Sequence, residues 1–299
     1  MPANETSPIN GFLNYLAFEK RYSANTILSY QNDLSAFFEY LAIEYQVSDL
    51  KEITPSIIRT WLASLKENKI SSKSINRKIS SLKSFFKYKL KLKEITVSPV
   101  SIISSLKISR RLPSFIEQND LNTLLKNDFF PDTFEGKTDF LIFEILYQSG
   151  IRRNELINLK EKDIDNFSGT IKVLGKGNKE RLIPVNNDLL KSIDEYIAEK
   201  RKIFGQLPEN FLLVNKGKSL YPKYVYNVVR SNLSKVSTNQ RKSPHILRHS
   251  FATHLTNNGA EINAVKELLG HSSLASTQIY THNTIEKLKE VYKQAHPKS

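Results

Sequence analysis

The first hundred residues of this chain repeat their apolar side chains at helical spacing and contain no convincing strand. In the segment INGFLNYLAFEKR, apolar residues recur at intervals of three and four, a pattern typical of an amphipathic helix. Ser23 is placed to cap a second helix, and Thr54 with Pro55 begins a third. A fourth helix is expected over roughly 72–90. This half of the chain is therefore predicted to be a helical bundle.

The helical period ends in a serine-rich stretch with two prolines, SPVSIISSLKISRRLPSF. We therefore expect an N-terminal domain at 1–106, a linker at 107–113 and a C-terminal domain at 114–299.

The C-terminal half mixes helices with a short sheet. Residues 132–150 predict a helix that ends at Gly150, and GTIKVLGKGNKERLIPV predicts two short strands around a Gly-Lys-Gly-Asn turn. Further helices are expected at about 187–204, 222–236, 244–258, 261–269 and 275–294. The expected fold class is mainly α with a small β-sheet (α+β).

The charge of the chain points to a polyanionic partner. It has 44 Lys and Arg against 30 Asp and Glu, a net charge of +14 over 299 residues, which favours nucleic acid. Ten basic residues and one acidic residue lie between Lys66 and Lys93. An ordinary solvated face is the alternative, but such a run can neutralise several phosphates and give salt-sensitive DNA binding. The candidate DNA contacts are Lys73, Arg77, Lys78, Lys83 and Lys87.

Several classes of protein are excluded or disfavoured. The chain has no cysteine, which rules out disulfides, thiolate zinc sites and cysteine nucleophiles and fits a reducing cytosol. The N-terminus lacks the pattern of a secretory signal, and no apolar run approaches the ~20 residues of a membrane span. We therefore expect a cytoplasmic protein. A metal site at His245 and His249 is not expected, because a third ligand and the glutamate of HExxH are missing.

Six residues scattered through the C-terminal half suit the chemistry of a phosphodiester: Arg152, Lys176, His245, Arg248, His271 and Tyr280. Cations and hydrogen-bond donors can crowd the phosphate, while a phenol attacks the phosphorus and becomes covalently linked to it. This chemistry needs no metal and no cofactor.

Two of these positions have ordinary explanations as well. Glu155 follows Arg152 by three residues and can hold a catalytic side chain in place, although the spacing alone favours an ordinary surface ion pair. Lys176 lies at the tip of the predicted hairpin, where it can protonate a departing oxygen or simply face solvent.

Four segments together resemble the motifs of the tyrosine recombinase (integrase) family, and more closely its Xer members: SGIRRNEL, LGKGNKERLIPV, PHILRHSFATHL and LLGHSSLASTQIYTH. The N-terminal segment FLNYLAFEKRYSANTILSYQNDLSAFFEYL resembles the family's helical core-binding domain. The terminal VYKQAHPKS resembles the Xer tail, in a form closer to XerC than to XerD.

The resemblance implies a role for each candidate. Tyr280 attacks the scissile phosphate and leaves a 3′-phosphotyrosyl bond and a free 5′-hydroxyl. Arg152 and Arg248 stabilise the transition state, with Glu155 in support. His245 and His271 donate to the phosphate, His245 being also the candidate acceptor of the phenol proton, and Lys176 protonates the leaving oxygen.

The resemblance also implies partners. Four protomers would hold two duplexes, with the C-terminal helix of each docking onto its neighbour rather than onto its own domain. We expect resolution of chromosome dimers at a dif-like site, with a second Xer recombinase and a DNA translocase as candidate partners. The alternatives are a mobile-element integrase or invertase, a relaxase similar to type IB topoisomerases, and a non-catalytic architectural DNA-binding protein.

Overall fold

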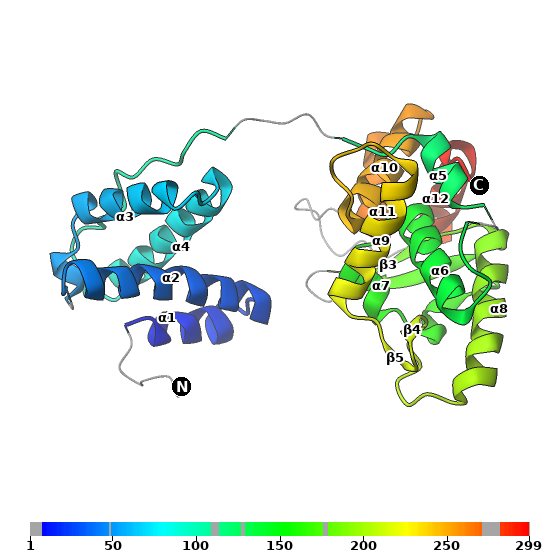
Figure 1. The fold of residues 1–299 in the computed structure, drawn as a ribbon, viewed down its shortest axis with the longest axis horizontal. Coiled ribbons are helices and arrows are strands. Elements are labelled where there is room, and N and C mark those ends of the chain that lie inside the picture. The colour runs from blue at the N-terminus through cyan, green and yellow to red at the C-terminus, as the bar shows by residue number, and fades with distance from the viewer. Residues whose placement is uncertain are drawn as a thin grey trace. The chain divides into compact units, whose positions relative to one another are not determined.

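The computed structural model describes residues 8–47, 49–108, 114–126, 129–175, 179–270 and 282–298, without the side chains of 282–285 and 287. The chain divides into two compact units, Met1–Arg111 and Leu112–Ser299, and each has its own apolar core (Figure 1). The point of division falls within the expected linker, 107–113, whose residues 109–113 lie outside the described part. The domain limits at 106 and 114 stay predictions.

The N-terminal unit is a bundle of helices. Its elements in order are α1 (Asn10–Asn14), a π-helical turn η1 (Tyr15–Glu19), α2 (Ala24–Glu44), a 3₁₀ turn η2 (Leu50–Glu52), α3 (Pro55–Glu67) and α4 (Ser72–Lys91).

The helix starts in this unit follow from their capping residues. Ser23 accepts a hydrogen bond from the backbone N–H of Thr26, and Thr54 accepts one from that of Ile57, with Pro55 in the first turn. Such caps satisfy N–H groups that have no partner within the helix. The capping roles predicted for Ser23 and Thr54 are confirmed.

A buried carboxylate ties α2 to α4. Asp33 of α2 is 1% exposed and accepts hydrogen bonds from Arg77 Nη1 at 2.7 Å, Lys78 Nζ at 3.1 Å and Ser81 Oγ at 2.9 Å. A charge out of water is tolerated when it is paired and hydrogen-bonded. Two residues of the basic run therefore also hold the bundle together.

The C-terminal unit contains most of the elements. They are α5 (Gln118–Leu124), α6 (Phe134–Ser149), α7 (Arg153–Asn158), the 3₁₀ turn η3 (Glu161–Asp163), β1 (Ile164–Asp165), β2 (Thr170–Leu174), β3 (Glu180–Pro184), α8 (Asn187–Phe204), β4 (Val214–Asn215), β5 (Lys218–Ser219), α9 (Pro222–Val236), α10 (Pro244–Asn257), α11 (Ile262–Leu269) and α12 (His282–Ala295).

The main sheet is small and surrounded by helices (Figure 1). Its three strands are antiparallel in the order β1-β2-β3, with Ile171 opposite Ile183 and Val173 opposite Arg181. Ile171, Val173 and Ile183 are buried, so one face of the hairpin packs into the core. The predicted fold class, mainly α with a small sheet, is confirmed. Among the helices of the described ranges, none combines the length and apolar character that a bilayer span requires.

The C-terminal helix α12 packs on its own domain. Leu288, Tyr292 and Ala295 are buried, and α12 contacts β3, α10 and α11. The Tyr292 hydroxyl donates to Gln148 Oε1 at 3.3 Å, and Asn258 Nδ2 donates to the Ala295 carbonyl at 2.7 Å. In the single chain its own domain covers the apolar face of the helix, and docking onto a neighbour in an assembly stays a prediction.

Candidate active site

A tight turn after α6 positions the first arginine. Gly150 ends α6 with φ +60°, and a Cβ atom there would lie 2.5 Å from Cδ1 of Phe251 on α10. Glycine is therefore required both by the left-handed backbone and by the close approach of α10. Two residues later Arg152 caps the N-terminus of α7. The turn thus brings Arg152 beside the helix that carries His245 and Arg248.

Glu155 holds Arg152 at two points. Its Oε2 accepts the backbone N–H of Arg152 at 2.7 Å, and its Oε1 accepts Nη1 of the same residue at 2.8 Å. Arg181 of β3 binds the same carboxylate through two hydrogen bonds, from Nη1 to Oε1 at 3.0 Å and from Nη2 to Oε2 at 2.8 Å. The Glu155 side chain is 7% exposed and that of Arg152 35%, so this pair is half-buried and not the exposed surface ion pair that the spacing alone favours.

These contacts also fix the ionisation of Glu155. Burial raises the pKa of the Glu155 carboxyl, but hydrogen bonds and positive charge from Arg181 and Arg152 outweigh burial and bring the pKa below its ordinary value. Glu155 is therefore a carboxylate at neutral pH.

Arg248 is anchored by two carbonyl groups. It lies on α10, and its Nη1 donates to the Gly150 carbonyl at 2.6 Å while its Nη2 donates to the Leu269 carbonyl at 2.5 Å. Arg152 Nη2 lies 3.4 Å from the next carbonyl, that of Gly270. Both guanidinium groups are thus fixed to the same end of α11, and positioning of this kind prepares a site for an anion before the anion arrives.

Positive charge exceeds negative charge in the cluster around Arg152 and Arg248. Burial, followed by the like charges of Arg152 and Arg181, lowers the pKa of Arg248 to about 10, so it stays protonated at neutral pH. Desolvation and the charges of Arg153, Arg248 and Arg152 lower the pKa of His245, which is then a neutral imidazole at pH 7. An anionic ligand would relieve this repulsion, and a neutral imidazole can accept a proton.

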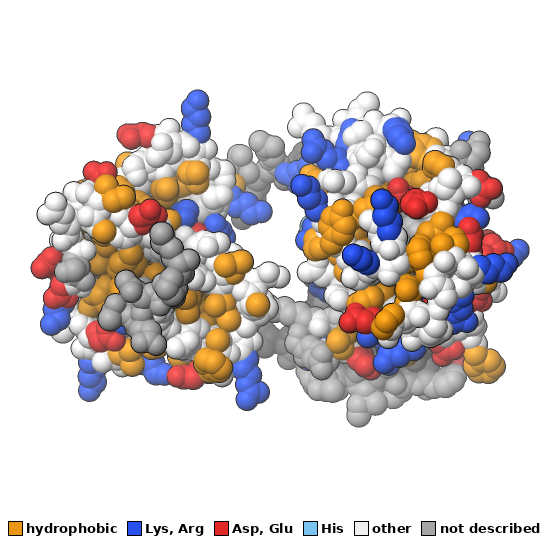
Figure 2. All heavy atoms as spheres, turned by 60° about the horizontal axis from the view of Figure 1, so that its bottom comes forward, with side chains coloured by type: hydrophobic (Ala, Val, Ile, Leu, Met, Phe, Trp, Pro, Cys, Tyr) orange, Lys and Arg blue, Asp and Glu red, His pale blue; other side chains and the backbone are white. Residues whose placement is uncertain are grey.

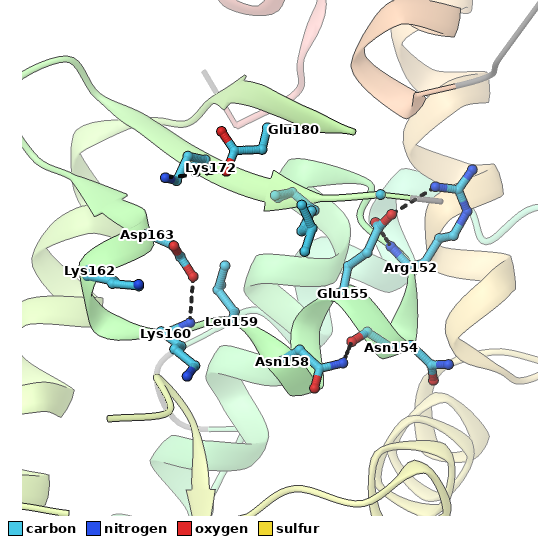
Figure 3. A pocket seen from close by; sticks show the side chains of 13 residues that line it. Arg152, Asn154, Glu155, Asn158, Leu159, Lys160, Lys162, Asp163, Lys172 and Glu180 are labelled. Atoms are coloured by element: carbon cyan, nitrogen blue, oxygen red, sulfur yellow. Dashed lines mark hydrogen bonds and ion pairs between the residues drawn. The ribbon is translucent and has the colours of Figure 1, made fainter. Parts of the chain in front are cut away.

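A hollow of about 520 Å³ opens beside Arg152, between α7, the η3 turn and the strands β2 and β3. Figure 3 shows Arg152 and Glu155 on one side of it and Lys160, Lys162 and Asp163 on the other. Basic and acidic side chains are mixed around this hollow, and at its Arg152 end the guanidinium is paired with the Glu155 carboxylate. Within the described ranges, no three His, Cys, Asp or Glu side chains are grouped as a metal site would need.

The structure brings four of the predicted site residues together: Arg152, Glu155, His245 and Arg248. Lys176, His271 and Tyr280 lie outside the described residues. The chain continues from Gly175 into Lys176 and from Gly270 into His271, and both glycines lie next to the arginine cluster.

Arg181 was not among the predicted site residues. Its strand carries a signal that points to it, because β3 alternates and Arg181 shares the inward face with the buried Ile183. An arginine at an inward-facing strand position requires a buried partner. That partner is Glu155.

The candidate DNA contacts on α4 fall into two groups. Lys73, Lys83 and Lys87 are exposed, whereas Arg77 and Lys78 pair with the buried Asp33, although the Arg77 side chain stays 49% exposed. On the face drawn in Figure 2, Lys and Arg side chains are scattered among neutral and apolar ones on both units. DNA contact by these five residues stays a prediction.

Comparison with known proteins identifies both parts of the chain. Residues 114–287 match the phage integrase family, and residues 9–93 match the SAM-like N-terminal domain of phage integrases. Tyrosine recombinase XerC of Anoxybacillus flavithermus is 36% identical over 99% of this chain and 99% of its own length. Tyrosine recombinase XerD of Staphylococcus saprophyticus is 34% identical over 97% of this chain and 99% of its own.

Solved structures show the same architecture. The XerH site-specific recombinase bound to a palindromic difH substrate, in a post-cleavage complex, superposes with a TM-score of 0.72 at 26% identity, over 91% of this chain and 80% of XerH. A lambda integrase dimer bound to a core site superposes with a TM-score of 0.69, over 91% of this chain and 98% of that one. At 18% identity the second similarity concerns the fold alone.

Proposed function

The chain belongs to the phage integrase family and is a site-specific tyrosine recombinase, and on that premise we propose that Arg152 and Arg248 bind the scissile phosphate that Tyr280 attacks. The observation that carries the proposal is the anchoring of both guanidinium groups at one end of α11, next to a neutral His245. Guanidinium groups match phosphate oxygens in geometry and charge.

The first step is an exchange of phosphate esters. The Tyr280 oxygen forms a bond to phosphorus, the bond from phosphorus to the 5′ oxygen breaks, and the DNA 3′ end stays attached through a phosphotyrosine. Negative charge grows on the non-bridging oxygens in the pentacoordinate transition state. Arg152 and Arg248 face that charge from fixed positions, and removal of one such donor commonly costs about 10²–10³-fold in rate.

Two protons must move in this step. The phenol has an ordinary pKa of about 10 and must lose its proton to become a good nucleophile. His245 is the candidate acceptor, since its lowered pKa keeps the imidazole neutral at pH 7. Lys176 is the candidate donor to the departing 5′ oxygen, and His271 the candidate second donor to the phosphate.

The reverse step completes recombination. A 5′-hydroxyl from a second duplex attacks the phosphotyrosine, a new phosphodiester forms, and the Tyr280 oxygen leaves and regains its proton. The ester bond is conserved throughout, so the cycle needs neither ATP nor a metal ion.

The substrate proposed for this chemistry is a dif-like site on double-stranded DNA, used to resolve chromosome dimers in the cytoplasm. Support comes from relatives at 34–36% identity named XerC and XerD, and from the likeness to XerH bound to difH. Four protomers on two duplexes, a second Xer recombinase and an activating translocase belong to the same proposal. A mobile-element integrase of the same chemistry is the second candidate.

A nicked suicide duplex tests this proposal. The duplex carries a dif-like site with a nick near the scissile phosphate, so that the cleaved fragment diffuses away and the covalent adduct accumulates on a denaturing gel. We expect an adduct in EDTA, its loss in Tyr280→Phe, and its persistence in Tyr221→Phe, a matched change at an exposed tyrosine. An adduct that survives Tyr280→Phe would contradict the proposal.

A further inference from the structure

Three consecutive carbonyl groups at the C-terminal end of α11 each face a different arginine. The Leu268 carbonyl accepts Arg181 Nε at 3.0 Å, the Leu269 carbonyl accepts Arg248 Nη2 at 2.5 Å, and the Gly270 carbonyl lies 3.4 Å from Arg152 Nη2. The last carbonyls of a helix have no partner within it and carry partial negative charge. The two proposed phosphate ligands and Arg181 are thus held by one helix end.

Arg181 lies where the segments of the site converge. A Cβ atom at Gly270 would lie 3.1 Å from Arg181 Cδ and 3.3 Å from Nε, and one at Gly175 would lie 3.4 Å from Nη1. Gly175 precedes Lys176, and Gly270 precedes the segment that contains His271 and Tyr280. Arg181 therefore lies beside the starting points of both segments, and it binds Glu155.

Arg181 also sets the charge that Arg152 presents. Glu155 bonds to both arginines, so the trio of Arg152, Glu155 and Arg181 carries a net charge of +1. Without Arg181, the Glu155 carboxylate would pair with Arg152 alone, and this pair would carry no net charge. A neutral pair attracts a phosphate much less than a cation does, above all in a site shielded from water.

We propose that Arg181 is a positioning residue of the recombinase: it shares the Glu155 carboxylate with Arg152, so that the trio keeps a net positive charge for the scissile phosphate, and it fixes the end of α11 from which the nucleophile segment continues. This role rests on the proposed assignment of Arg152 to the phosphate. Arg181 itself is buried and acts through Glu155 and the Leu268 carbonyl.

The test measures the rate of adduct formation with a saturating amount of the nicked suicide duplex, and the affinity for that DNA separately. In Arg181→Met the rate should fall about 100-fold, the scale of a misplaced catalytic group, with DNA affinity within about threefold of wild type. The double variant Arg181→Met with Glu155→Gln should recover at least about tenfold of that loss, because a neutral amide no longer cancels Arg152.

The matched control is Lys200→Met. Lys200 is another buried cation of the same unit, 2% exposed, which pairs with Glu161 at 2.8 Å and donates to the Leu212 carbonyl at 2.9 Å. Its replacement should lower the midpoint of thermal unfolding without a comparable loss of cleavage rate. Should Arg181→Met not fold, Arg181→Lys takes its place, since it keeps a cation beside Glu155 but loses the forked bonds; we then expect about a tenfold slower cleavage at unchanged affinity.

The outcomes separate clearly. Three outcomes would each overturn the role of Arg181. The cleavage rate of the Arg181 variant could lie within threefold of wild type, or the double variant could cleave no faster than Arg181→Met. Lys200→Met could also lose as much cleavage rate as Arg181→Met. Wild type and Arg152→Ala are measured alongside. If wild type forms no adduct, or Arg152→Ala cleaves as fast as wild type, the assignment of Arg152 fails and the role of Arg181 fails with it. If those two behave as proposed, a normal Arg181 variant refutes the positioning role alone.

Discussion

The exposed lysines of α4 should set the salt dependence of DNA binding. Lys73, Lys83 and Lys87 are exposed, whereas Arg77 and Lys78 are held by the buried Asp33. The perturbation is the triple change of the three exposed lysines to glutamine, which removes three charges from the surface and none from the buried cluster around Asp33.

The magnitude follows from counterion release. Each phosphate contact contributes about 0.9 to the slope of log K against log salt, so three contacts contribute about 2.7. Over a fourfold rise in salt, from about 50 to 200 mM, the affinity advantage of wild type over the triple variant should shrink by about 40-fold.

The assay is a titration of a fluorescent duplex carrying one binding site, followed by anisotropy at several salt concentrations. A matched control changes three exposed lysines of the C-terminal unit, Lys191, Lys202 and Lys218, to glutamine. The control should keep the wild-type slope, since none of its positions is proposed to touch DNA. An unchanged slope in the α4 variant, or an equal change in the control, would refute contact between α4 and the DNA backbone.

Three further changes test other parts of the structure. Glu155→Gln should lower the midpoint of thermal unfolding at pH 7, and this difference from wild type should disappear at acid pH. Because the pKa of folded Glu155 lies below its ordinary value of 4.5, its carboxylate contributes stability above pH 4.5 that is lost as the pH falls through the folded pKa. A difference that persists at acid pH would contradict this. The cleavage rate should fall only below about pH 6.5, because the pKa of His245 lies below the ordinary histidine value of 6.5. In His245→Gln the fall of the rate at acid pH should disappear. A wild-type rate that already falls between pH 8 and pH 7 would argue against His245 as the base. Leu288→Ala should destabilise the isolated chain by about 2–5 kcal/mol in chemical denaturation, since Leu288 is buried on its own domain, and an unchanged stability would mean that α12 does not pack there in solution.

Local sequence signals predicted most of the helices. Helices α8 and α9 have the predicted limits, 187–204 and 222–236, and α10 ends one residue earlier than expected. Each is amphipathic or begins at a capping residue or proline, so the information lies within the segment itself. The two-residue strands β1, β4 and β5 were not predicted, because strands so short carry no periodicity.

Contacts between distant segments were harder to predict. Asp33 binds residues of α4 that lie 44 to 48 positions later in the sequence, and Arg181 binds Glu155, 26 positions earlier. The local sequence pattern shows only that each of these charged side chains faces inward, and not which residue it meets. The packing of α12 depends on whether its apolar face meets its own domain or a neighbour, which the helix pattern does not distinguish. The arginine cluster itself was predicted through resemblance, whereas its anchoring on the α11 carbonyls follows from the fold.

The identity of the nucleophile most directly tests the assignment of the chemistry to Tyr280. The covalent adduct made with the suicide duplex would be digested with nuclease and trypsin, and the peptide that keeps a nucleotide identified by mass spectrometry. Cleavage after Lys266 and Lys287 releases the peptide 267–287, which contains a single tyrosine, Tyr280. We expect the nucleotide on this peptide, linked through a 3′ phosphate. A nucleotide on any other peptide, or a 5′ linkage, would contradict this assignment.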